Sequence, residues 1–82
     1  METLPKIIVY GAAWCGDSRR ARAVLERHKI AYEWIDIDLN AEARRRVETL
    51  NNGMRSVPTI LFPDGSIMVE PADQELESKL GV

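Results

Sequence analysis

The chain has 82 residues, 45% of them hydrophobic, and a formal net charge of −2 at pH 7. This length allows a single domain, residues 1–82, and the slightly acidic balance disfavours nucleic acid or an anionic membrane surface as a partner. No apolar run approaches the roughly 18 residues of a membrane-spanning helix. The start, METLPKIIVY, lacks the basic and apolar regions of a signal peptide. We therefore expect a cytoplasmic protein whose fold is sufficient as a monomer.

The first predicted elements alternate between strand and helix. The β-branched and aromatic run at 7–10 predicts a buried strand. Apolar residues at helical spacing predict a helix over 16–28. Alternating apolar and polar residues over 32–38 then predict a second strand, half exposed.

The second half of the chain predicts another helix, a hairpin and a last helix. Asn40 is a good N-cap for a helix that the Asn-Asn-Gly sequence at 51–53 ends. Residues 57–62 and 66–69 predict two strands joined by a tight Pro-Asp-Gly turn. Asp73 lies where the last helix opens. The order β-α-β-α-β-β-α predicts an α/β fold with one four-stranded mixed sheet flanked by helices.

Cys15 is the only cysteine and His28 is the only histidine. A single cysteine excludes an internal disulfide framework and a multi-cysteine zinc site, and we expect no bound metal. Whatever chemistry Cys15 performs, it performs as a lone thiol.

The position of Cys15 favours reactivity. It lies where the loop after the first strand enters the first helix, and the free N–H groups and dipole of a helix N-terminus stabilise a thiolate. Thiolate is both the nucleophile and the better leaving group in disulfide exchange. The nearby carboxylate of Asp17 opposes this effect. The alternative is an inert core cysteine, which the polar neighbours in this loop disfavour.

A second signal is the sequence Ser56-Val57-Pro58-Thr59. A proline at the start of a strand is ordinary at a sheet edge, but this strand must lie beside the central strand to complete the sheet. A cis bond before Pro58 would reconcile the two and would expose the backbone of Val57 near the thiol. The alternative is a plain strand start.

These features together resemble the glutaredoxin family, including its small mycoredoxin-like members, over nearly the whole chain. The resemblance rests on a series of motifs in the family's order: a strand ending in Tyr10, Trp14-Cys15-Gly16-Asp17-Ser18, Ser56-Val57-Pro58, and the Pro-Asp-Gly hairpin.

The resemblance implies a thioredoxin fold, with Cys15 as the nucleophile and a cis peptide bond before Pro58. It places Asp73 in contact with the amine end of glutathione. The other residues expected at the thiol-binding cleft are Trp14, Gly16, Asp17 and Val57.

The chain departs from the family at two positions. Ser18 stands where dithiol members have a second cysteine, and a serine cannot resolve a mixed disulfide. We therefore expect a monothiol route with Ser18 as a helix cap or a hydrogen-bond partner of the thiolate. Ala12 replaces a lysine that grips the carboxylate of glutathione, and Arg55 is a candidate substitute, although a solvated arginine is an equal alternative. The small thiol is therefore glutathione, mycothiol or bacillithiol, and the partners are disulfide-containing or thiolated proteins.

Two other functions remain open from the sequence. Monothiol relatives can carry an iron–sulfur cluster on thiolate ligands, but those members have phenylalanine where this chain has Asp17, and a longer preceding loop. A redox-inactive binding module on the same fold is the second alternative.

Overall fold

The computed structural model describes residues 6–82, so the first five residues of the METLPKIIVY segment lie outside it. The element order is β-α-β-α-β-β-α, as predicted. The elements are β1 (Ile7–Gly11), α1 (Gly16–Arg27), β2 (Tyr32–Asp36), α2 (Ala41–Leu50), β3 (Thr59–Leu61), β4 (Ile67–Val69) and α3 (Asp73–Leu80). Within the described residues, no helix is long and apolar enough to cross a membrane.

The four strands form one mixed sheet in the order β2-β1-β3-β4. β1 pairs in parallel with β2 and antiparallel with β3, and β3 pairs antiparallel with β4. β1 is an interior strand of the sheet, and its apolar side chains are buried on both faces. Val9 is fully buried on one face and Tyr10 is nearly fully buried on the other.

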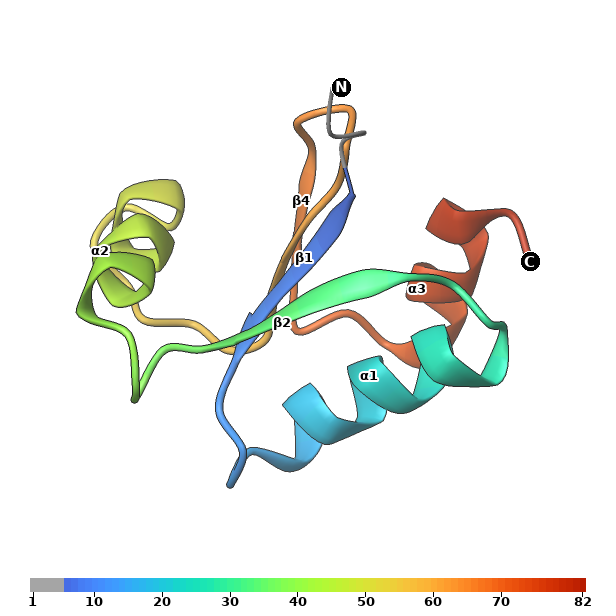
Figure 1. The fold of residues 1–82 in the computed structure, drawn as a ribbon. Coiled ribbons are helices and arrows are strands. Elements are labelled where there is room, and N and C mark those ends of the chain that lie inside the picture. Colours follow the sequence, from blue (N-terminus) through green and yellow to red (C-terminus); the bar gives the residue numbers. More distant parts are fainter. Residues whose placement is uncertain (1–5) are drawn as a thin grey trace, which may run out of the picture.

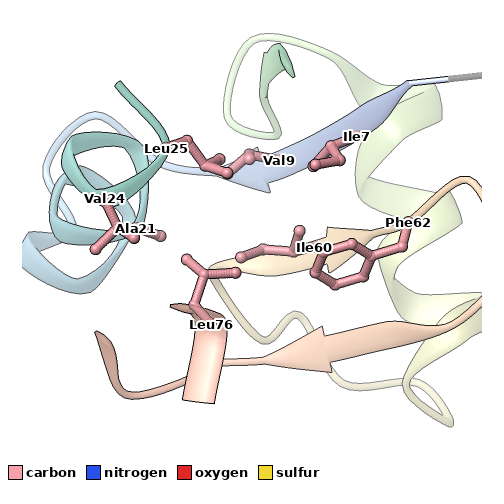
Figure 2. Close-up of a cluster of buried hydrophobic side chains, with 8 residues drawn as sticks. All are labelled: Ile7, Val9, Ala21, Val24, Leu25, Ile60, Phe62 and Leu76. Atoms are coloured by element: carbon pink, nitrogen blue, oxygen red, sulfur yellow. The ribbon is translucent and has the colours of Figure 1, made fainter. Parts of the chain in front are cut away.

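The helices cover the two faces of the sheet unequally. α1 and α3 lie together on one face, whereas α2 lies alone on the other (Figure 1). The larger core fills the space between the sheet and the helix pair, and Figure 2 shows its side chains converging from β1, α1, β3 and α3. This core consists of Ile7, Val9, Ala21, Val24, Leu25, Ile60, Phe62 and Leu76.

The smaller core lies beneath α2, where Ala43 and Val47 meet Tyr10 and Ile37. Asn40 caps this helix as predicted, because its Oδ1 accepts a hydrogen bond from the backbone N–H of Ala43 at 2.9 Å.

Charged side chains join α1 to α3 beside the larger core. Glu77 of α3 pairs with His28 Nε2 at 2.8 Å and with Arg27 Nη2 at 3.2 Å. The hydrogen bond from His28, followed by the bond from Arg27, lowers the pKa of Glu77 below its ordinary value.

β2, β3 and β4 are shorter than the sequence pattern predicts, whereas β1 continues one residue further, to Gly11. β2 ends at Asp36 because the Asp36 carboxylate accepts the N–H of Asp38 at 2.9 Å, which turns the chain. β3 begins at Thr59 and not at residue 57, since Pro58 has no N–H to donate to the sheet. β4 begins one residue late because the Asp64 carboxylate holds the N–H of Ser66 at 2.9 Å in the turn.

Candidate active site

Cys15 is the N-cap residue of α1, at the end of the loop that leaves β1. Its backbone is extended, with φ −81° and ψ 119°, and its N–H donates to the carbonyl of Ala12 at 3.0 Å. The thiol is free and partly exposed. Cys15 therefore lies partly exposed at the N-terminal end of α1, where the first N–H groups of the helix have no partner within the helix.

The segment before β3 lies against this thiol. The S–H of Cys15 points at the carbonyl oxygen of Val57 with an Sγ–O distance of 3.8 Å. The Val57–Pro58 peptide bond is cis, which confirms that prediction. The carbonyl of Pro58 accepts the N–H of Glu70 at 2.9 Å, which attaches the segment between β4 and α3 to the same place. Residues 57 and 58 therefore contact the Cys15 side chain through one carbonyl and the segment between β4 and α3 through the next.

Ser18 is fully buried beneath the loop, and its Oγ accepts the N–H of Ala12 at 3.3 Å. The hydroxyl thus supports the backbone of the loop that carries Cys15. Ala12 is also fully buried, so the position where the resembling family has a lysine presents no group to a ligand.

Gly11 lets the buried side chain of Ser18 and the partly buried side chain of Trp34 approach the end of β1. A Cβ atom at this position would lie 2.7 Å from Ser18 Oγ and 2.7 Å from Cζ3 of Trp34. Real Cβ contacts are longer than this, so glycine is required here. Gly11 was not among the predicted site residues, although a glycine at the end of a buried strand is a sequence signal for such a close approach.

Trp14 lies beside Cys15 with 71% of its surface exposed. Its indole Nε1–H donates to Asp38 Oδ2 at 2.6 Å, so the loop after β2 fixes the orientation of the ring. Asp38 was not among the predicted site residues, and nothing in the linear sequence connects it to Trp14, 24 positions away.

Three charged side chains form a bridge between α1 and α3. Arg20 Nη1 contacts Asp17 Oδ1 at 3.0 Å, and Arg20 Nε contacts Asp73 Oδ1 at 3.1 Å. The two predicted carboxylates are therefore brought together by the same arginine side chain.

Arg55, the other charged residue predicted for this site, pairs with Glu48 of α2 at 2.5 Å and is mostly exposed. Among residues 6–82, no group of three or more histidine, cysteine, aspartate or glutamate side chains is placed to hold a metal ion.

The fold and the site define a class of protein. The β-α-β-α-β-β-α fold carries a free cysteine at the start of its first helix, facing the backbone before a cis-proline, which is the arrangement of thioredoxin-fold proteins. The glutaredoxin family model matches residues 7–67. The chain belongs to the glutaredoxin family.

Individual relatives agree with this assignment. A candidate glutaredoxin of Mycobacterium tuberculosis is 38% identical over 74 residues, covering 90% of this chain and 88% of its own. Mycoredoxin 1 of Corynebacterium glutamicum is 30% identical over 77 residues, which cover 94% of this chain and 95% of the relative. The crystal structure of a thioredoxin-like protein superimposes with a TM-score of 0.78 at 27% identity, covering 89% of this chain and 97% of the other.

Proposed function

We propose that this protein exchanges thiols and disulfides by a monothiol route, with Cys15 as the nucleophile. The observation that carries the proposal is the partly exposed thiol at the N-terminus of α1, 3.8 Å from the Val57 carbonyl. The substrates are proteins joined by a disulfide to a small thiol. Ser18 occupies the position of a second cysteine, so Cys15 has no resolving partner within the chain.

The route has two balanced steps. The Cys15 thiolate attacks the small-thiol sulfur of the mixed disulfide, which breaks that S–S bond, forms a new one to Sγ and releases the protein thiolate to take a proton. A second molecule of small thiol, as its thiolate, then attacks the small-thiol sulfur of the adduct. This step forms the small-molecule disulfide and returns the electron pair to Cys15. The second small thiol is thus the reductant.

The residues around the site favour a small thiol that is not held by charge. Arg55 is engaged by Glu48, and Ala12 is buried, so neither is placed to grip a carboxylate. Glutathione and bacillithiol carry carboxylates, whereas mycothiol has none and its amine is acetylated. Together with the relative named Mycoredoxin 1, this supports mycothiol over glutathione and bacillithiol. We also propose that the protein acts in the cytoplasm as a monomer.

The test is to incubate the reduced protein with the disulfides of glutathione, mycothiol and bacillithiol and to follow the Cys15 adduct by intact mass. Fast formation with mycothiol disulfide, reversed by free mycothiol and absent in Cys15→Ser, is the expected result. A reaction with all three that is no faster than that of a free cysteine would overturn the exchange function and favour a cluster carrier or a binding module.

A further inference from the structure

A cavity of about 350 Å³ lies between the first turns of α2 and the face of the sheet on which α2 lies alone (Figure 1). Its sheet wall consists of Tyr10 of β1 and Ile35 of β2, which are paired residues of neighbouring parallel strands. Its helix wall consists of Asn40, Glu42, Ala43 and Arg46. Cys15 does not line the cavity, and the volume is within the range of small-ligand sites.

The hydroxyl of Tyr10 supplies an unused polar group in this cavity. Tyr10 is only 6% exposed, and it belongs to the smaller core with Ala43 and Val47. Among residues 6–82, no hydrogen bond involves its hydroxyl, whereas every fully buried side-chain N or O atom has a partner. The hydroxyl is therefore not fully buried, and it reaches the surface through the cavity that Tyr10 lines. Since the O–H of a buried tyrosine usually has a partner, this one is available to a ligand.

Two opposite charges line the same cavity without pairing. Glu42 and Arg46 lie four residues apart in α2, in the order that favours an ion pair on a helix. Both are exposed, and neither belongs to an ion pair in the part of the chain that the structure describes. Glu48 of the same helix is different, because it pairs with Arg55. The cavity thus offers a carboxylate and a guanidinium beside an apolar wall.

We propose that this cavity binds a small zwitterion with an apolar body, a class that includes the apolar α-amino acids. Arg46 and the O–H of Tyr10 donate hydrogen bonds to the carboxylate of the ligand, and Glu42 accepts hydrogen bonds from its ammonium group. The apolar body lies against Ile35 and the ring of Tyr10. The site is independent of the exchange reaction at Cys15.

The test is a titration of the protein with L-phenylalanine, followed through the backbone amide signals in NMR spectra. Because both charges of the site are exposed to solvent, we expect a Kd of about 1 mM. The shifts should saturate and should be largest at the residues that line the cavity. 3-Phenylpropionate lacks the ammonium group and 2-phenylethylamine lacks the carboxylate, so each should bind about threefold more weakly than L-phenylalanine.

Two variants test the residues of the site. Tyr10→Phe removes only the hydroxyl and should raise the Kd for L-phenylalanine about threefold, as expected for one hydrogen bond. Arg46→Gln should raise it by about the same factor through the lost ion pair. Arg45→Gln is the matched control, because Arg45 is the neighbouring exposed arginine, does not line the cavity and carries the same charge. Its Kd should stay unchanged, and the amide spectrum of each variant without ligand checks the fold.

Three results would each overturn the proposal. The first is a set of shifts that do not saturate or that are centred outside the cavity. The second is equal binding of L-phenylalanine and its two singly charged analogues, which would show that the two charges are not used together. The third is an equal rise of the Kd in Arg45→Gln and Arg46→Gln, which would reduce the effect to net charge.

Discussion

The hydroxyl of Ser18 should stabilise the loop that carries the thiol, and Ser18→Ala isolates this contribution. Ser18 is fully buried, and its Oγ is the acceptor for the N–H of Ala12, which is buried as well. The substitution removes the acceptor and adds no bulk, so the Ala12 N–H is left in the interior without a partner.

The magnitude follows from the cost of that unpaired donor. Leaving a buried N–H unsatisfied costs about 1–3 kcal/mol. The N–O distance here is 3.3 Å, slightly beyond the usual range of about 2.7–3.2 Å for such bonds. We therefore expect the lower part of that range, about 1–2 kcal/mol. Alanine is the better helix former by up to about 0.5 kcal/mol, which offsets part of the loss.

Urea denaturation measures this difference in the free energy of unfolding. Ser78→Ala, at an exposed position of α3, is the reference for the gain in helix propensity. Relative to Ser78→Ala, Ser18→Ala should lower the urea concentration at the unfolding midpoint by about 1–2 M, for a denaturant slope m of about 1 kcal/mol/M. The slope m should be the same in both variants. Equal midpoints for the two variants would refute the role given to the Ser18 hydroxyl.

Two further predictions concern packing and pH. Gly11→Ala should lower the free energy of unfolding by about 2 kcal/mol in urea denaturation, because the new methyl group overlaps the side chains of Ser18 and Trp34. Glu77→Gln should flatten the acid side of the stability profile, since the bond from His28 holds the pKa of Glu77 low. The stabilisation is fully present at pH values above the ordinary glutamate pKa of about 4.3. It is lost as the pH falls through the lower pKa that Glu77 has in the folded protein.

Each of these predictions has its own control. Gly16→Ala introduces the same methyl group at the start of α1, where the nearest heavy atom lies 4.0 Å away, and should cost nothing or stabilise the helix. Similar losses in both glycine variants would contradict the packing argument. For the second prediction, the free energy of unfolding is measured between pH 3 and 7 for Glu77→Gln and for the unmodified protein. Parallel curves would show that the His28–Glu77 contact contributes nothing to the pH dependence of stability.

The sequence pattern was sufficient for the fold because the elements are bounded by residues with strong local preferences. Asn40 caps its helix through a side chain three residues from its partner, so the signal is local. The position of β3 beside β1 also followed, since a β-α-β unit and a hairpin leave few ways to complete one sheet. The same reasoning led to the cis bond before Pro58.

The charged and hydrogen-bonded parts of the site could not be obtained in this way. The pairing of Trp14 with Asp38, and of Arg20 with Asp73, joins residues whose separation in the sequence carries no periodic signal. Such contacts depend on where loops from different elements end, and on which of several nearby charges is within reach. Strand ends were overestimated for a related reason, because side-chain acceptors such as Asp36 compete with the sheet for backbone N–H groups.

The meeting of Cys15 with the Val57 carbonyl joins residues 42 positions apart. Neither the helix end nor this neighbour exists around the sulfur in an unfolded chain, although unfolding makes the sulfur more accessible. The rate at which a thiol reagent modifies the sulfur should therefore differ between the folded and the unfolded chain. Because the sequence holds one cysteine, that single rate reports the fraction of molecules that are folded.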